Sequence, residues 1–111
     1  MLFRSTEKGL IADARNILNR KLSESLTVKD LISELGVSRR KLELAFRLHL
    51  DVSPYQFLII ERLHAAREML KRSRKSVLEV SLDCGFDDPS RFANMYARQF
   101  DELPSETRNR R

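Results

Sequence analysis

The sequence predicts an all-α protein of seven helices, and two observations lead to that prediction. Apolar residues recur at the three- and four-residue spacing of helices, and no run alternates between apolar and polar residues as a strand does. A short pattern also occurs twice, about fifty residues apart, beginning at Leu31 and at Val80. Each copy is an amphipathic helix that stops at a glycine, a turn that opens on a capping residue, and a second helix. This is the form of a helix-turn-helix.

Composition and charge narrow the class of protein. The 111 residues are the size of one domain, and 41% hydrophobic residues suffice for one or two small cores. With 21 Lys and Arg against 16 Asp and Glu, the net charge of +5 favours a polyanionic partner such as DNA, although the surplus could serve solubility alone. No apolar run approaches the ~20 residues of a membrane span, and the N-terminus lacks the apolar block of a signal peptide. The sequence therefore predicts a soluble cytoplasmic protein.

The first two helices follow from apolar spacing and capping residues. Residues 1–8 are expected to be flexible, and a helix is expected from about residue 9 to about residue 22. Thr27 is a typical N-cap, and Asp30 three residues later completes a capping box. The helix that they open is predicted to end at Gly36.

The third helix completes the first motif, which spans about residues 27–50. Ser38 caps this helix, and Asp51, which tolerates a left-handed conformation, follows its end. Its buried side is expected to be formed by Leu42, Ala45, Phe46 and Leu50.

A long helix without a breaker is predicted between the two motifs. Ser53 caps it, Pro54 fits its first turn, Gln56 completes a capping box, and it continues to about Ser73. At ~1.5 Å per residue it would be roughly 30 Å long, close to the ~34 Å between successive major-groove faces of B-DNA. It could hold two readers in adjacent grooves, or serve only as a core helix shared by two small bundles. Either role requires burial of one stripe, formed by Ile59, Leu63, Ala66 and Leu70.

The second motif, about residues 76–100, has its own capping signals. Ser76 and Glu79 form a capping box for a helix that is expected to end at Gly85. Asp88 caps the following helix, with Pro89 in its first turn. The side expected to be buried consists of Phe92, Met95, Tyr96 and Phe100. A last short helix is predicted to open at Pro104.

Landmarks along nearly the whole chain resemble the DNA-binding domain of the AraC/XylS family of bacterial transcription regulators. They are Leu26, Thr27, Leu31, Gly36, Val37, Ser38, Leu42, Phe46, Val52, Ser53, Pro54, Phe57, Arg62, Leu63, Ala65, Ala66, Leu70, Gly85, Phe86, Phe92, Phe100, Pro104 and Arg108. The resemblance implies an AraC-type DNA-binding domain over residues 9–111, with a linker helix at about 54–73. It also implies insertion of each motif's second helix into a major groove, most often for activation, with RNA polymerase as a further partner.

Members of that family usually carry a second domain that binds an effector or dimerises. The chain has no room for one, so it is expected to be either a short stand-alone member or the excised DNA-binding end of a longer regulator. No dimerisation seam stands out, and a monomer on DNA is predicted.

Residues on the outer faces of the first reading helix are candidate DNA contacts. Because Leu42 and Phe46 face the core, the available residues are Arg39, Arg40, Lys41, Glu43, Leu44 and Arg47. Three of them match base-contacting positions of the family: Arg40, Glu43 and Leu44. Arginine can bond a guanine with two hydrogen bonds, glutamate can accept from cytosine, and leucine can touch a thymine methyl. Leu44 departs from the polar or arginine residue common there, and Arg39 and Lys41 could contact phosphates or form a solvated face.

The second reading helix offers a smaller and less basic set. Its available residues are Ser90, Arg91, Asn94 and Arg98. The first three match base-reading positions of the family, and asparagine can read adenine with two hydrogen bonds. Residues 38–47 carry a net charge of +3, whereas residues 87–98 carry zero because they include Asp87 and Asp88. The first motif is therefore predicted to dominate affinity.

Other chemistry finds little support in the sequence. His49 and His64 have no metal ligands at suitable spacing, no phosphate-binding glycine loop is present, and Cys84 is best interpreted as an inert core thiol. We therefore predict no enzyme, no metal and no cofactor. The alternative to a DNA-binding regulator is a helical protein-interaction adaptor that keeps the fold without specific DNA binding, which Leu44 and the Asp87–Asp88 pair would favour.

Overall fold

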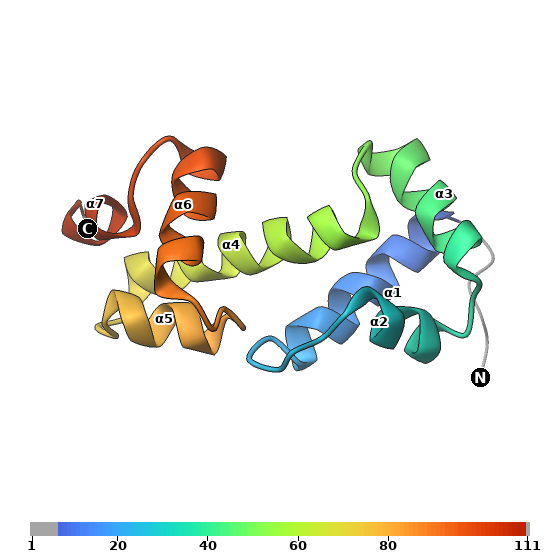
Figure 1. Cartoon of the computed structure of the whole chain (residues 1–111), viewed down its shortest axis with the longest axis horizontal. Coiled ribbons are helices and arrows are strands. Elements are labelled where there is room, and N and C mark those ends of the chain that lie inside the picture. The colour runs from blue at the N-terminus through green and yellow to red at the C-terminus, as the bar shows by residue number, and fades with distance from the viewer. Residues whose placement is uncertain (1–6, 111) are drawn as a thin grey trace. The chain divides into compact units, whose positions relative to one another are not determined.

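The computed structural model describes residues 7–110, and over this range it contains seven helices and no strand, as predicted (Figure 1). The helices are α1 (Glu7–Arg20), α2 (Val28–Leu35), α3 (Arg39–Leu50), α4 (Pro54–Arg72), α5 (Val77–Asp83), α6 (Pro89–Phe100) and α7 (Pro104–Asn109). None of these helices is long and apolar enough to cross a membrane.

The chain forms two compact units. The first takes the residues up to Lys21 and Leu26–Ile59, and the second takes Leu22–Ser25 and the chain from Ile60 onward. The division falls within α4, so α4 contributes to the core of each unit. Each predicted helix-turn-helix lies within one unit: α2 and α3 in the first, α5 and α6 in the second.

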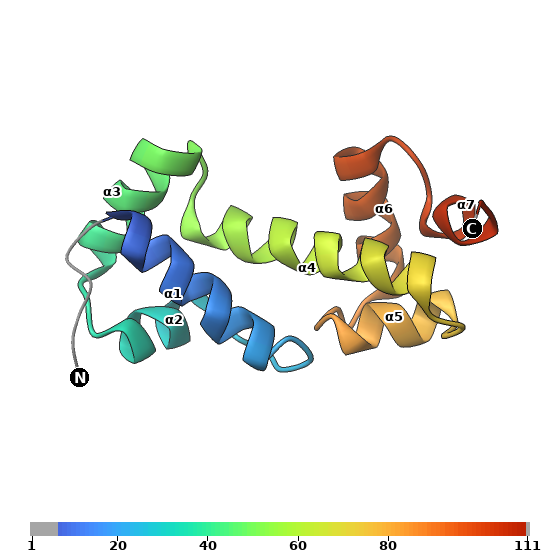
Figure 2. The same cartoon turned by 180° about the vertical axis from the view of Figure 1, so that it is seen from behind.

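The core of the first unit forms where α1 packs against α2 and α3 (Figure 2). Its centre includes the rings of Phe46 and Phe57, which meet edge to face with centroids 4.7 Å apart. Three of the four residues expected on the buried side of α3 are buried, but Leu50 is 39% exposed. Leu50 is the last residue of α3, and the chain turns at Asp51 (φ 54°) before the helix can continue over the core. The other buried hydrophobic side chains that form this core are Leu10, Ile11, Ala14, Ile17, Leu18, Leu26, Leu31, Leu35, Leu42, Ala45 and Leu58.

Local capping sets the helix ends of the first unit as predicted. The Thr27 hydroxyl accepts a hydrogen bond from the Asp30 amide at 3.1 Å, and the Thr27 amide donates to the Asp30 carboxylate at 3.0 Å. These bonds hold the pKa of Asp30 below its ordinary value. Gly36 ends α2 in the left-handed region (φ 67°), and the Ser38 hydroxyl accepts from the Lys41 amide at 3.1 Å. Both ends of the turn between α2 and α3 are thus set by neighbouring residues in the sequence.

The second unit packs α5 against α6 and α6 against α7. Neighbouring rings of Phe86, Phe92, Tyr96 and Phe100 lie 4.7–5.7 Å apart. Only Phe92 and Tyr96 of the four predicted α6 core residues are fully buried, whereas Met95 and Phe100 are half-buried. Phe100 lies against the exposed His64 ring at 5.2 Å and under the Arg67 guanidinium at 4.7 Å, so α4 covers it with partly polar side chains.

Several predicted boundaries need correction. Helix α1 begins at Glu7 and ends at Arg20, so residues 7 and 8 are helical, and the remaining residues predicted to be flexible, 1–6, lie outside the described range. In the stripe of α4, Leu63, Ala66 and Leu70 are buried, but Ile59 is only half-buried. Helix α5 ends at Asp83 rather than at the glycine, because the Gly85 amide bonds back to the Leu82 carbonyl and tightens the last turn.

Both reading helices end at an aspartate in the left-handed region. Asp51 follows α3 with φ 54°, as predicted, and Asp101 follows α6 with φ 57°. Each aspartate amide donates to the carbonyl four residues earlier, which is the single bond of a left-handed C-cap.

Candidate nucleic-acid interface

The first reading helix, α3, presents all six predicted contact residues to solvent. Burial of three residues on one side of α3 fixes its orientation in the first unit. The residues that this leaves exposed include Arg39, Arg40, Lys41, Glu43, Leu44 and Arg47. Arg40, Leu44 and Arg47 are spaced four and three residues apart and therefore share one face, opposite the core. The structure thus places Arg40, Leu44 and Arg47 on one face of α3, and the other three predicted contacts are exposed elsewhere around the helix.

The positive charge on α3 is not neutralised within the described part of the chain. Within that part, the four Lys and Arg side chains of α3, Arg39, Arg40, Lys41 and Arg47, form no ion pair, and the first turn of α3 contains no acidic residue. Three of these cations occupy the helix N-terminus, where the helix dipole disfavours positive charge and attracts anions. A bound phosphate at this end of α3 would relieve that repulsion.

The second reading helix, α6, is positioned by a different cap. The Asp88 carboxylate accepts hydrogen bonds from the amides of Ser90 and Arg91 at 3.0 and 3.2 Å, and Pro89 occupies the first turn. Asp88 is therefore used as predicted, while Asp87 remains exposed beside it. The four predicted contacts of α6 are exposed: Ser90, Arg91, Asn94 and Arg98.

A buried arginine of α4 fixes the turn between α5 and α6. Arg62 is 4% exposed, and its Nη1 donates to the carbonyl of Cys84 at 2.9 Å. Nη1 also donates to the carbonyl of Leu22, and Nη2 donates to that of Glu24 at 3.0 Å. All four residues belong to the second unit. Arg62 thereby ties three separate segments of this unit together.

The backbone at Gly85 lies so close to the Arg62 side chain that only glycine fits there. The φ of Gly85 is 88°, and a Cβ at this position would lie 1.8 Å from Nη1 of Arg62 and 2.8 Å from the Leu22 carbonyl oxygen. Burial lowers the pKa of Arg62, and the hydrogen-bonding carbonyls take the place of a carboxylate partner. In the sequence, Arg62 stands out only as a landmark of the family resemblance. Its position next to Leu63, a residue of the apolar stripe, was the feature of the sequence that could have indicated a buried arginine.

Cys84 is fully buried, as predicted for a core thiol. Burial raises the pKa of its thiol to about 12, so the reactive thiolate is suppressed at neutral pH.

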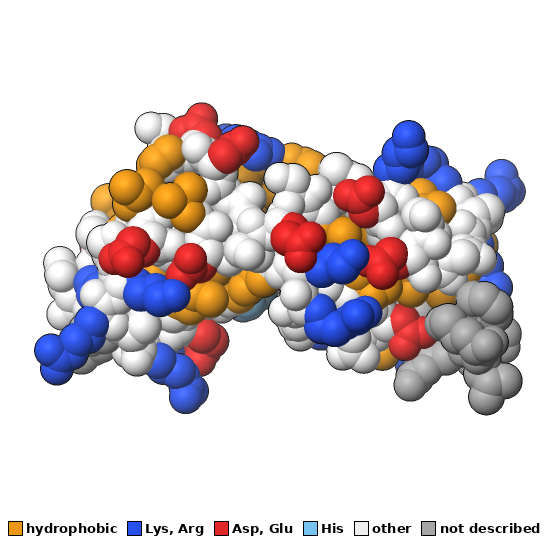
Figure 3. Space-filling model, turned by 90° about the horizontal axis from the view of Figure 1, so that it is seen from below, with side chains coloured by type: hydrophobic (Ala, Val, Ile, Leu, Met, Phe, Trp, Pro, Cys, Tyr) orange, Lys and Arg blue, Asp and Glu red, His pale blue; other side chains and the backbone are white. Residues whose placement is uncertain are grey.

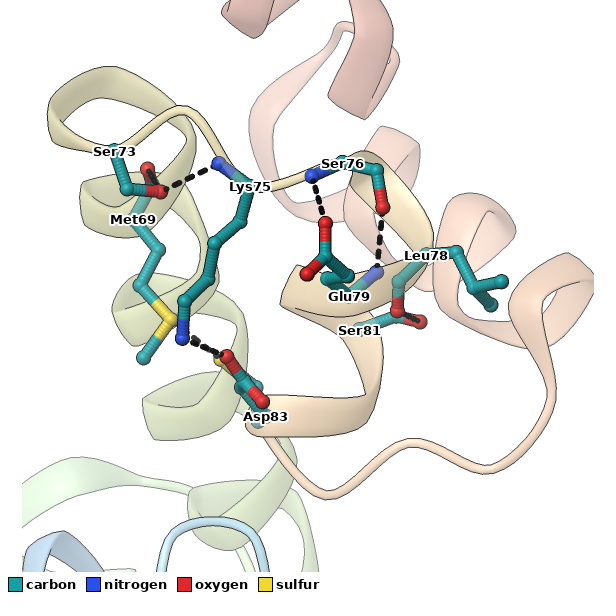
Figure 4. A network of polar contacts seen from close by, with 9 residues as sticks. Met69, Ser73, Lys75, Ser76, Leu78, Glu79, Ser81 and Asp83 are labelled. Carbon is teal, nitrogen blue, oxygen red and sulfur yellow. Dashed lines mark hydrogen bonds and ion pairs between the residues drawn. The ribbon is translucent and has the colours of Figure 1, made fainter.

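The loop before α5 is closed by a small polar network (Figure 4). The Ser76 hydroxyl accepts from the Glu79 amide at 3.0 Å, and the Ser76 amide donates to the Glu79 carboxylate at 2.9 Å, forming the predicted capping box. Lys75 pairs with the carboxylate of Asp83 at the other end of α5. This bond and the charge of Asp83 raise the pKa of Lys75. The network thus joins the loop to both ends of α5.

Exposed leucines occur in two different electrostatic settings. Leu78 and Leu82 of α5 are 52% and 50% exposed, and Figure 3 shows apolar side chains at the surface of the second unit, on the left, with acidic ones close by. Leu44 and Leu48 of α3 are 54% and 62% exposed on a helix whose four Lys and Arg side chains form no ion pair with any residue that the structure describes. Leu48 was not among the predicted contacts, although its four-residue spacing from Leu44 was visible in the sequence.

Comparisons with known proteins agree with this geometry. A model of a helix-turn-helix domain family matches residues 31–110. The HTH-type transcriptional regulator CdhR of Pseudomonas aeruginosa is 42% identical over 91 residues, which cover 82% of this chain and 27% of that protein. The chain thus spans about a quarter of the length of this relative.

Solved structures extend the comparison. A crystal structure of a transcriptional regulator with an AraC-type DNA-binding domain from Chromobacterium violaceum is similar with a TM-score of 0.87 and 30% identity, covering 93% of this chain and 92% of that one. The DNA-binding domain of AdpA, solved in complex with a target DNA, has a TM-score of 0.80 and 29% identity, covering 96% and 93%.

Proposed function

The chain belongs to the AraC family of helix-turn-helix proteins, and from that membership we propose that it binds DNA sequence-specifically as a bacterial transcription regulator. The observation that carries the proposal is the outer face of α3, where basic side chains that form no ion pair within residues 7–110 lie beside the positions expected to contact bases. The similarity to a domain solved on its target DNA supports it. We assign the regulator to the bacterial cytoplasm, where its DNA is.

We propose that α3 and α6 enter adjacent major grooves. On α3, Arg40 would bond a guanine, Glu43 would accept from a cytosine, and Leu44 would contact a thymine methyl. Arg39, Lys41 and Arg47 would bind phosphates, since they are exposed on the same helix. On α6, the contacts would be Ser90, Arg91, Asn94 and Arg98.

We further propose that the protein activates transcription, with RNA polymerase as a second partner. We also propose that the chain binds DNA as a monomer. Both proposals rest on the family's usual mode of action and on the domain assignment of residues 9–111. Size-exclusion chromatography at low micromolar concentration tests the monomer, and a stable dimer would overturn it.

The second candidate function is a helical protein-interaction adaptor. The apolar pair Leu78 and Leu82 and the acidic Asp87 at the surface of the second unit favour it. Salt separates the two functions, because binding that neutralises several phosphates weakens steeply as salt rises, whereas an apolar protein contact does not.

The experiment is a selection from random duplex DNA by the purified 111-residue chain, followed by titration of the selected site across a salt series. We expect an asymmetric motif of two blocks about one helical turn apart, bound ~10³-fold or more tighter than random DNA. Failure to enrich any motif would overturn the proposal and leave the adaptor function.

A further inference from the structure

Two leucines on α3 remain at the surface where a polar helix face would be expected. Leu44 is 54% exposed and Leu48 is 62% exposed, whereas Leu42 on the opposite side of the helix is fully buried. The two exposed leucines lie one helical turn apart and form a short apolar stripe. The stripe does not contribute to the core of the first unit, so its exposure has no structural benefit within that unit.

The surroundings of the stripe indicate what covers it. Arg40 and Arg47 lie on the face of α3 that includes Leu44. Lys41 is three residues before Leu44 and seven before Leu48, so it lies on the side of the helix that includes Leu48. All three are exposed and form no ion pair within residues 7–110. An apolar stripe among unpaired cations fits a partner that is polyanionic overall and carries small apolar groups. The leucine pair on α5 lacks this charge and has acidic residues such as Glu79 near it.

The major groove of DNA offers one apolar group, the C5-methyl of thymine. The other base edges there present hydrogen-bond donors and acceptors, which a leucine would desolvate without a bond in return, and cytosine carries at C5 only a hydrogen in place of the methyl. A leucine stripe therefore favours thymine over the other bases.

We propose that Leu44 and Leu48 together read thymine methyl groups in the DNA block bound by α3. The inference rests on the proposed DNA-binding function and adds the base class that this stripe selects. Four residues of helix extend about 6 Å, and base pairs are stacked about 3.4 Å apart. The two methyls recognised thus lie within about two base-pair steps of each other.

The first test removes only the methyl group. In the selected site, each thymine of the α3 block is replaced in turn by deoxyuridine, and the affinity is measured by titration. We expect a loss of about 3- to 10-fold at one or two positions, the size that a buried methyl gives. The same replacement in the α6 block serves as the control and leaves the affinity unchanged. Replacing a critical thymine by cytosine lowers binding, and 5-methylcytosine at that position restores part of it.

The second test asks whether the effect of the thymine methyl depends on the two leucines. Leu44→Ala and Leu48→Ala are expected to weaken binding to the thymine site about 3- to 10-fold and to remove the difference between thymine and deoxyuridine. Leu82→Ala removes an equally exposed leucine from the second unit and serves as the matched control, with no change expected. Circular dichroism of each variant checks that helix content is retained.

The outcomes separate this inference from the function on which it rests. If a site is selected and bound but deoxyuridine has no effect in the α3 block, the methyl-reading inference is overturned and the regulator function stands. If Leu44→Ala and Leu48→Ala bind thymine and deoxyuridine sites with the original difference, the inference is also overturned. If no site is enriched at all, the proposed function itself fails.

Discussion

The two helix-turn-helix motifs of the chain have the same pattern of residues but are held in different ways. In the first motif, Gly36 leaves α2 with φ 67° and Ser38 caps α3, so the bonds at this turn join residues within four positions of each other. In the second motif, the turn at Gly85 closes on Arg62, which belongs to a different helix. A repeated sequence pattern therefore specifies the shape of a turn without specifying what stabilises it.

The motifs also differ in the charge that they offer to DNA. The reading segment of the first, residues 38–47, carries +3, and that of the second, residues 87–98, carries zero. We therefore expect the first motif, whose turn is held by local bonds, to attract phosphates more strongly than the motif tied to Arg62. Stability and affinity are expected to depend on different motifs.

The largest effect is expected from Arg62→Met. The change leaves the carbonyls of Leu22, Glu24 and Cys84 without their donor, and we expect it to lower the free energy of unfolding by about 4 kcal/mol. Chemical denaturation measures the loss. Arg72→Met, which removes an exposed pair with Glu68, is the control and should cost less than about 0.5 kcal/mol. Equal losses in the two variants would contradict the role assigned to Arg62.

Alanine at the two turn glycines compares the motifs directly. Gly85→Ala places a Cβ 1.8 Å from Arg62 Nη1, and we expect a loss of about 3 kcal/mol. Gly36→Ala strains only the left-handed conformation and should cost about 1 kcal/mol. Thermal or chemical unfolding gives the order, and a larger loss at Gly36 would show that the second turn is not the more constrained one.

Removal of one arginine from each reading helix compares the motifs on DNA. Arg40→Ala is expected to weaken binding to the selected site by about 2 kcal/mol, and Arg91→Ala by less, because the second motif has no net positive charge. Titration of both variants on the same site gives the answer. The predicted dominance of the first motif is wrong if Arg91→Ala proves the more costly change.

The smallest effect is expected in the pH dependence of the free energy of unfolding, to which the two capping boxes contribute. Hydrogen bonds from Thr27 lower the pKa of Asp30 from 3.8, and those from Ser76 lower the pKa of Glu79 from 4.5. Because the pKa of each carboxyl group is lower in the folded state, each box stabilises its helix fully at pH values above the ordinary pKa. That contribution is lost as the pH falls through the folded pKa. Asp30→Asn and Glu79→Gln should each flatten the acid limb of the stability profile. Unchanged acid limbs in both variants would argue against the boxes as its source.

Most of the fold was predictable because its determinants are local. The caps at Thr27, Ser38, Ser76 and Asp88 and the turn at Gly36 each depend on residues within four positions, which the sequence shows directly. The exposure of Leu50 was missed because it depends on where α3 ends relative to its core rather than on apolar spacing.

The candidate site was predictable only where it follows from helix faces. All ten predicted contacts are exposed, as helical periodicity required. The bonds of Arg62 were not predictable, because they join residues as far as 40 positions apart. Leu48 was visible at the right spacing, but its significance depends on its exposure in the fold, among cations that form no ion pair within residues 7–110.

The aspartates that end both reading helices bear on how the regulator could change its target. Asp51 and Asp101 hold a conformation that glycine adopts more readily, and each places a negative charge at the negative end of a helix dipole. Asp51→Gly and Asp101→Gly should each raise the free energy of unfolding by about 0.5–1 kcal/mol, which chemical denaturation can measure. Neither residue is among the proposed base contacts. The chain therefore has two sites where stability can increase during evolution to offset new side chains on α3 or α6 that alter specificity but weaken the fold.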